Sequence, residues 1–231
     1  MIKLRYANDR GTANFGWLDS KHTFSFGHYY DPKHMGFSAL RVINDDLVKP
    51  GAGFDTHGHR DMEIISYVLE GVIEHKDSEG NVQTLPAGEF QLMSAGSGIY
   101  HSEYNGSQSE DLKFLQIWIQ PNTSGNKPGY QQKDFGKNTG LTAIATPDGR
   151  DGTLHIKQDA SLFQLILEPG QSIELPIAND RKVYVHQVTG QLSIDDVLLT
   201  SGDGAKIEAQ SQLSFANQSN ESVTALVFDL P

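Results

Sequence analysis

The chain has 231 residues, and its 18 basic against 29 acidic side chains give a formal charge of −11. A surface that acidic repels phosphate backbones, so we expect no direct nucleic-acid ligand. No apolar run approaches the roughly 20 residues of a membrane-spanning helix, and the absence of cysteine excludes disulfide scaffolds, thiolate zinc sites and thiol nucleophiles.

The N-terminal segment, MIKLRYANDRG, does not read as a signal peptide. It contains basic residues, but neither an apolar stretch nor a small-residue cleavage site follows them. We therefore expect a cytoplasmic protein.

Apolar and polar residues alternate in short segments along the chain. Residues 63–69, 112–119 and 182–188 show the period of two that is typical of strands with one buried face. The 23 glycines and frequent Asn, Asp and Ser separate such runs, and sustained helical periodicity is scarce. The sequence predicts an all-β protein of antiparallel sandwiches.

A glycine pattern recurs in the two halves of the chain. Gly51 is followed 20 residues later by Gly71, and Gly170 is followed 20 residues later by Gly190, so the copies are offset by 119 residues. Such a repeat predicts two β-barrel-like halves. Segment 122–138 is rich in Gly, Asn, Lys and Pro without strand alternation, and we expect it to be a linker between domains at residues 1–121 and 139–231.

Two short motifs could hold a metal ion: His57-Gly58-His59 and His101-Ser102-Glu103. Each is weak alone, because a sequence with nine histidines can produce such a triplet by chance. On a strand, however, side chains two residues apart share a face, with Cα atoms about 7 Å apart. Two such pairs on facing strands offer three imidazoles and one carboxylate, which suit Fe(II), Mn, Co, Ni, Cu or Zn and disfavour Ca and Mg.

The same residues resemble the first motif of the cupin superfamily, G-x5-H-x-H-x3/4-E-x6-G. Gly51, His57, His59 and Glu63 match it, and the closing Gly71 comes one residue late.

The second cupin motif, G-x5-P-x-G-x2-H-x3-N, is matched by Gly88, His101 and Asn105. Ser94 replaces the proline, and two extra residues precede the histidine. These departures affect loop geometry rather than the ligand set.

The chain resembles the pirin family, both in these departures and in the segments that precede the cupin motifs. The segments that carry the resemblance are, in order along the chain, residues 17–19, 24–26, 30–32 and 36–46, followed by THGHRDMEI and GIYHSEYN. The resemblance implies a bicupin, with two antiparallel β-sandwich or jelly-roll domains and one metal ion, usually iron, in the N-terminal domain. For bacterial members it also implies quercetin 2,3-dioxygenase activity.

The pirin pattern takes its carboxylate ligand from Glu103, whereas other cupins take it from the position of Glu63. A regular strand places Glu63 about 13 Å beyond His59, while Glu103 shares a face with His101. The predicted metal ligands are therefore His57, His59, His101 and Glu103, and Glu63 is expected to be structural or to lie outside the ligand set.

The second half is predicted to hold no metal. The offset of 119 places Pro176 and Ala178 at the positions of His57 and His59, and neither side chain can bind a metal. The remaining histidines are predicted to be packing or surface groups: His22, His28, His34, His75, His155 and His186. Residues 44–46 are predicted to form a turn.

The resemblance implies a metal-dependent dioxygenase that cleaves the heterocyclic ring of flavonols such as quercetin. One divalent transition metal, with Fe(II) favoured, would be the cofactor, and Glu103 would act as the base. The expected partners are a flavonol-like small molecule and dioxygen, with the protein acting as a monomer. Two alternatives remain: a non-catalytic regulator that binds a protein partner and uses the metal as a redox or structural element, and a cupin that binds another small molecule.

Overall fold

The protein is built from antiparallel strands. The structure, a computed structural model, describes residues 1–231 and contains twenty-two strands and two short 3₁₀ helices, η1 (Ala7–Asp9) and η2 (Arg150–Gly152). The all-β prediction is confirmed. No helix in it has the length and apolar character to cross a membrane.

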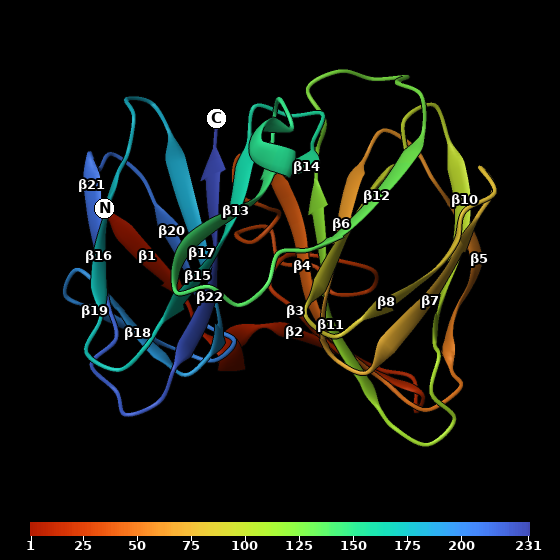
Figure 1. Ribbon diagram of the computed structural model, residues 1–231, viewed down its shortest axis with the longest axis horizontal. Coiled ribbons are helices and arrows are strands. Elements are labelled where there is room, and N and C mark those ends of the chain that lie inside the picture. Colours follow the sequence, from red (N-terminus) through yellow and green to blue (C-terminus); the bar gives the residue numbers. More distant parts are fainter. The chain divides into compact units, whose positions relative to one another are not determined.

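The N-terminal unit contains two sheets that face each other across its interior (Figure 1). The larger has seven strands in the order β12 (Gly129–Asp134), β9 (Glu89–Ser94), β6 (Glu63–Glu70), β11 (Leu112–Ile119), β4 (Leu40–Val48), β3 (Leu18–His22) and β2 (Gly11–Asn14). The smaller has the order β5 (Gly53–His59), β10 (Ile99–Asn105), β7 (Val72–Asp77) and β8 (Val82–Pro86). The predicted strands at 63–69 and 112–119 are β6 and β11.

The interior of this unit is apolar in one part and polar in another. Val68 and Phe114 from the larger sheet pack with Ile73 and Leu85 from the smaller one, and all four are buried. Buried polar residues gather in another part of the interior, and this part contains the site described below.

The C-terminal unit also has two sheets. One contains neighbouring strands in the order β1 (Ile2–Arg5), β20 (Gly204–Ile207), β17 (Lys182–Thr189), β22 (Val223–Leu230), β15 (Ser161–Leu167) and β13 (Gly140–Thr146). The other has the order β16 (Ser172–Pro176), β21 (Gln212–Ala216), β18 (Gln191–Ile194) and β19 (Val197–Thr200). Its core includes Leu165, Val185, Leu213, Phe215 and Val227, none more than 1% exposed.

The predicted repeat is present in the strands. The offset of 119 residues takes β5 onto β16 and β6 onto β17, and each pair occupies the same place in its unit. Two antiparallel β-sandwiches in one chain agree with the expected bicupin layout.

The unit boundaries differ from the predicted ones at both ends of the first domain. Residues 11–136 and 154–158 form the N-terminal unit, which includes the short strand β14 (Leu154–His155), while 1–10, 137–153 and 159–231 form the C-terminal unit. Residues 1–10 belong to the C-terminal unit because β1 pairs with β20. The predicted linker contains β12, an edge strand whose residues are all half-buried or exposed, so its sequence shows no alternation.

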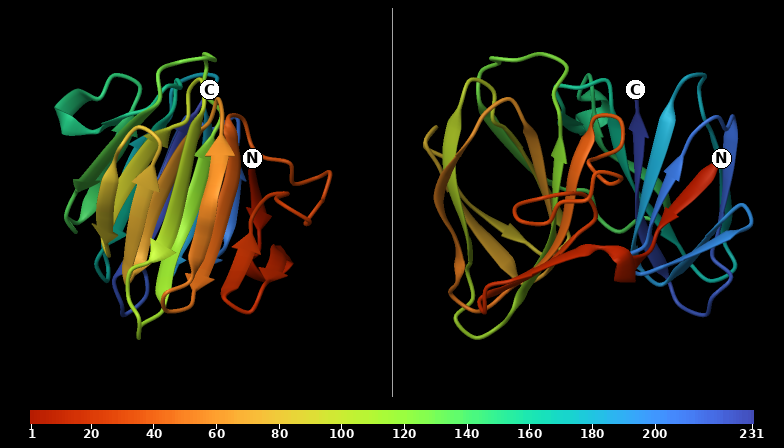
Figure 2. Two further views of the ribbon diagram at one scale, coloured as in Figure 1. Left: turned by 90° about the vertical axis from the view of Figure 1, so that its right-hand side faces the viewer. Right: turned by 180° about the vertical axis from the view of Figure 1, so that it is seen from behind.

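The segment predicted as a turn at 44–46 is part of β4 instead. Asn44 and Asp46 are each 2% exposed, and Asn44 Oδ1 lies 2.8 Å from His22 Nδ1 on β3. Polar partners inside the unit therefore replace the local turn that these residues favour. The loop between β3 and β4 extends beyond the strands on one side of this unit (Figure 2).

Candidate metal centre

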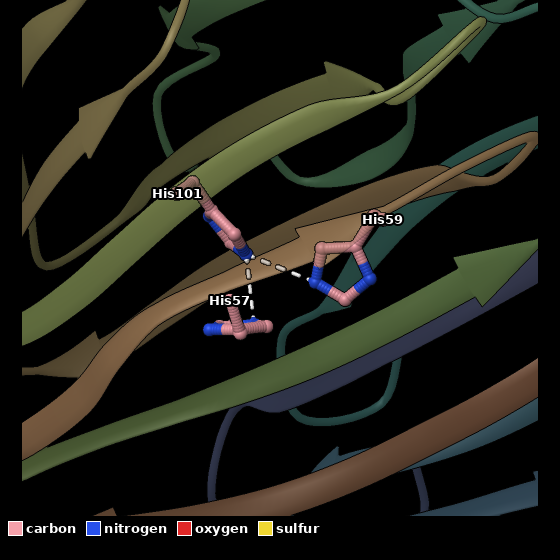
Figure 3. Close-up of side chains that lie close together, drawn as sticks. All are labelled: His57, His59 and His101. Atoms are coloured by element: carbon pink, nitrogen blue, oxygen red, sulfur yellow. Dashed lines mark hydrogen bonds between the residues drawn. The ribbon is translucent and has the colours of Figure 1, made fainter.

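Three of the predicted ligands converge inside the N-terminal unit. His57 and His59 come from β5 and His101 from its neighbour β10. The His101 Nε2 atom lies 3.1 Å from His57 Nε2 and 3.0 Å from His59 Nε2, so the three rings point at one another (Figure 3).

A β-bulge contributes to this arrangement. Phe54 pairs with Glu103 and His57 pairs with His101, so β5 carries one extra residue between the two pairs. Bulges bend a strand and re-aim its side chains, and they are common beside active sites. The bulge begins beside Gly53, where a Cβ atom would lie 2.4 Å from the Glu103 carbonyl oxygen. Glycine is therefore required for the two strands to approach.

The ring nitrogens of the three histidines are available to a metal ion. Burial and the neighbouring imidazoles lower the pKa of His59 to about 4 and that of His101 to about 3. His57 Nδ1 lies 2.7 Å from the Asp55 carbonyl oxygen, which can only accept, so Nδ1 carries the proton and Nε2 keeps its lone pair.

The spacing of the nitrogens also fits an ion. Two ligand atoms about 2.1 Å from one metal, at right angles to each other, lie about 3.0 Å apart. The observed separations of 3.0 and 3.1 Å match this geometry. The three histidines can therefore hold a divalent transition-metal ion.

Glu103 lies next to His101, in a group distinct from the three histidines. One of its carboxylate oxygens and one ring nitrogen each of His75 and His101 lie within 4.8 Å of one another. Its carboxylate accepts hydrogen bonds from Gln91 Nε2 (2.6 Å), Ser66 Oγ (3.2 Å) and Gln116 Nε2 (3.1 Å). Glu103 is thus buried, oriented and beside the centre, and its coordination of the metal stays a prediction.

Glu63 belongs to neither group. Its carboxylate accepts hydrogen bonds from Ser94 Oγ (2.9 Å) and from the backbone N–H of Lys157 (3.2 Å). Burial raises the pKa of Glu63 and outweighs these two bonds, which act in the opposite direction.

Two residues near the centre were not predicted from the sequence. His75, predicted to be an isolated packing group, is buried on β7 and its ring lies 5.5 Å from that of His101. Tyr130, in the predicted linker, donates through its hydroxyl to Gln91 Oε1 (3.0 Å), and Gln91 in turn holds Glu103. The motif His75-Lys76-Asp77 has the same spacing as the two ligand motifs and could have signalled the first residue.

Aromatic rings flank the centre on the side of His59. The Trp118 ring lies 5.0 Å from the His59 ring, and Phe26 packs edge-on against Trp118 at 5.3 Å. Trp118 Nε1 donates to Gln116 Oε1 at 3.2 Å, so the indole is linked through Gln116 to Glu103.

Comparisons with known proteins cover the whole chain. Residues 3–119 match the family model Pirin, and residues 143–230 match the Quercetinase C-terminal cupin domain. The chain is 51% identical to the quercetin 2,3-dioxygenase of Escherichia coli, covering 100% of this chain and 99% of that one. It is 39% identical to a pirin-like protein of Caulobacter vibrioides, covering 93% and 94%.

Solved structures agree with this relationship. The bacterial pirin YhhW from Escherichia coli in complex with nickel(II) superposes with a TM-score of 0.96 at 49% identity, over 100% of this chain and 99% of that one. A quercetin 2,3-dioxygenase from Acinetobacter baumannii, at 19% identity and a TM-score of 0.78, shares the fold over 98% and 85% of the two chains. With both halves matched and these ligand motifs in place, the chain belongs to the pirin family.

Proposed function

We propose that this protein is a metal-dependent dioxygenase that opens the heterocyclic ring of flavonols such as quercetin. The convergence of three imidazole Nε2 atoms beside a buried, oriented carboxylate carries the proposal. The similarity to the quercetin 2,3-dioxygenase of Escherichia coli, 51% identical over the full length, supports it.

His57, His59, His101 and Glu103 are the proposed ligands. Fe(II) is the proposed native ion, although Mn, Co, Ni, Cu and Zn suit the same donors. When bound, the ion supplies Lewis acidity and a centre for dioxygen chemistry.

The chain's own residues position the substrate and handle its proton. We infer that the Glu103 carboxylate takes the proton of the flavonol 3-hydroxyl, because it is buried and one of its oxygens lies within 4.8 Å of a ring nitrogen of His101. Gln91 and Gln116 keep its oxygens in place throughout. The Trp118 ring offers a flat apolar surface against which a planar flavonol can stack.

The test combines metal analysis with turnover. Protein purified without oxygen and loaded with Fe(II) should bind one ion per chain and bleach the flavonol absorbance only when dioxygen is present. His57→Ala should lose both the ion and the activity, while Glu63→Gln should keep the ion.

Two results would contradict the proposal. Full metal in His57→Ala would refute the ligand set, and stoichiometric metal without flavonol turnover would favour the regulator with a protein partner.

We also propose that the protein works as a cytoplasmic monomer. Sedimentation of the purified chain would test its oligomeric state, and cell fractionation would test its location.

A further inference from the structure

A second set of buried polar side chains lies beside the three histidines. His75 and Asp77 stand two residues apart on β7 and therefore on one face. In the register of β7 with β10, His75 is directly opposite Glu103 and Asp77 is directly opposite His101. Cross-strand partners on one face are in contact, so this pair adjoins the proposed ligands.

Asp77 determines which nitrogen of His75 carries the proton. The two side chains are fully buried, and His75 Nε2 lies 3.0 Å from Asp77 Oδ2. The Asp77 carboxylate also accepts from the backbone N–H groups of Glu79 and Asn81, so it is fixed in place. Because a carboxylate accepts only, His75 Nε2 is the donor, and in a neutral imidazole this leaves a lone pair on Nδ1.

His101 needs the opposite tautomer, with its proton on Nδ1. Its Nε2 points at His57 and His59, and a histidine that binds a metal through Nε2 carries its proton on Nδ1. The Nδ1 atoms of His101 and His75 are both buried and have no hydrogen-bond partner within the chain. With these tautomers, His101 Nδ1 is a donor and His75 Nδ1 is an acceptor, and the centres of the two rings are 5.5 Å apart.

We propose that His75 is a positioning residue of the metal centre: with its proton held on Nε2 by Asp77, it accepts the His101 Nδ1–H through one buried water molecule. The Glu103 carboxylate, in the same group of buried donors, gives that water a third partner. The contact fixes the tautomer and ring angle of His101. This inference rests on the proposed binding of metal by His101.

The first measurement is Ni(II) affinity, by competition with a chelator. Removing such an outer partner of a ligand typically lowers metal affinity about 10- to 100-fold, and we expect this of His75→Phe. His75→Gln retains a donor for Asp77 and an acceptor for the water, so it should stay close to the parent protein. Asp77→Asn should weaken binding like His75→Phe, because its amide can donate to Nε2 and move the proton to Nδ1.

The second measurement separates positioning from packing. In the Co(II)-loaded protein, each ligand imidazole should give one hyperfine-shifted exchangeable N–H resonance. One of the three should broaden or exchange faster in His75→Phe and should return in His75→Gln. His186→Phe is the matched control: it removes another buried histidine, on β17 of the C-terminal unit, and should change neither readout.

The outcomes are distinguishable. If the parent protein lacks one tightly bound Ni(II) and its imidazole resonances, the proposed metal centre fails. If the parent has both, three results would overturn the role of His75. The Ni(II) affinity could be unchanged in His75→Phe, or it could fall as much in His75→Gln as in His75→Phe. It could also fall in His75→Phe while all three imidazole resonances stay intact. Two Ni(II) ions per chain that fall to one in His75→Phe would also overturn it, because His75 would then be a ligand.

Discussion

At the scale of single residues, two buried carboxyl groups of the N-terminal unit have different surroundings. Glu103 is held by three side-chain donors, and Asp46 is buried on β4 with a hydrogen bond from Ser20. Burial raises the pKa of Asp46 to about 7, and the nearby Asp45 and Glu103 charges add to the effect while Ser20 opposes it. The two carboxyl groups are therefore expected to respond differently to substitution.

The role of Glu103 can be divided by substitution with glutamine. If Glu103 is only a ligand, Glu103→Gln should lose metal affinity and turnover together, and excess metal should refill the site and restore turnover. If Glu103 is also the base, turnover at saturating metal should stay about 10²- to 10⁴-fold below the parent. Steady-state rates across a metal titration decide between these outcomes, and an equal loss in Glu63→Gln would show that the wrong carboxylate was chosen.

The neutral amide in Asp46→Asn should stabilise the protein at alkaline pH. The pKa of Asp46 rises from 3.8 unfolded to about 7 folded, so the folded state holds the extra proton between these values. Its contribution to stability is present at low pH and is lost as pH rises from about 4 through 7. The difference in free energy of unfolding between Asp46→Asn and the parent, from urea denaturation, should be larger at pH 8 than at pH 5. An equal difference at both would contradict this.

At the scale of elements, the pairing of β5 with β10 creates the site. Both strands carry proposed ligands two residues apart, and the bulge between the Phe54 and His57 pairings lets β5 present His57 against His101. In the C-terminal unit, β16 and β21 pair without a bulge, from Ser172 with Ala216 to Pro176 with Gln212. The bulge is thus found in the strand pair that carries the three histidines and not in the corresponding pair of the C-terminal unit.

Gly53→Ala should damage this pairing. The added Cβ would lie 2.4 Å from the Glu103 carbonyl oxygen and 2.5 Å from Tyr104 Cα, both backbone atoms that cannot easily move. We expect a loss of about 1–3 kcal/mol in the free energy of unfolding, together with weaker metal binding. Gly129→Ala on β12 is the control, because a Cβ atom added at Gly129 would have no atom within 4 Å beyond those of Gly129 and its two chain neighbours. Its free energy of unfolding should stay within about 0.5 kcal/mol of the parent value. Similar losses in the two variants would contradict the argument.

The strands and the same-face spacing of His57 and His59 follow from local sequence, whereas the meeting of His101 with these two residues and the rest of the site depend on pairing. Alternation and the His-x-His spacing are properties of one strand, so they place β6, β11 and the same-face ligands. The bulge, the position of His75 opposite Glu103 and the edge strand β12 depend on which strands become neighbours. One sequence without its register cannot specify these.

At the scale of the whole molecule, the two halves share a fold but differ in their interiors. Asn105 is the last residue of β10 and Asn217 directly follows β21. Aligning these two asparagines puts Leu213 and Phe215 at the positions of His101 and Glu103. Both are fully buried in the C-terminal core. The second half therefore keeps the scaffold with an apolar interior where the first has its site.

The two asparagines allow a matched experiment. Asn105 Nδ2 donates to the carbonyl oxygens of Val48 and Glu110, and Asn217 Nδ2 to those of Leu167 and Glu221. Replacing either with alanine leaves carbonyls unpaired and should lower stability by about 1–3 kcal/mol.

Only Asn105→Ala should also weaken metal binding, because it lies two residues from Glu103 on β10. Thermal unfolding and Ni(II) titration of both variants would test this. Weaker metal binding in Asn217→Ala would contradict it.

The pairing of β1 with β20 has a consequence for synthesis on the ribosome. Ile2 emerges early, yet its partner Ile207 is made about 200 residues later, which at roughly 5–20 residues per second is a wait of about 10–40 s. Residues 11–136, together with 154–158, are complete well before that. The unit with the candidate metal centre can therefore fold while the nascent chain is still growing, and β1 is among the last strands to find its place.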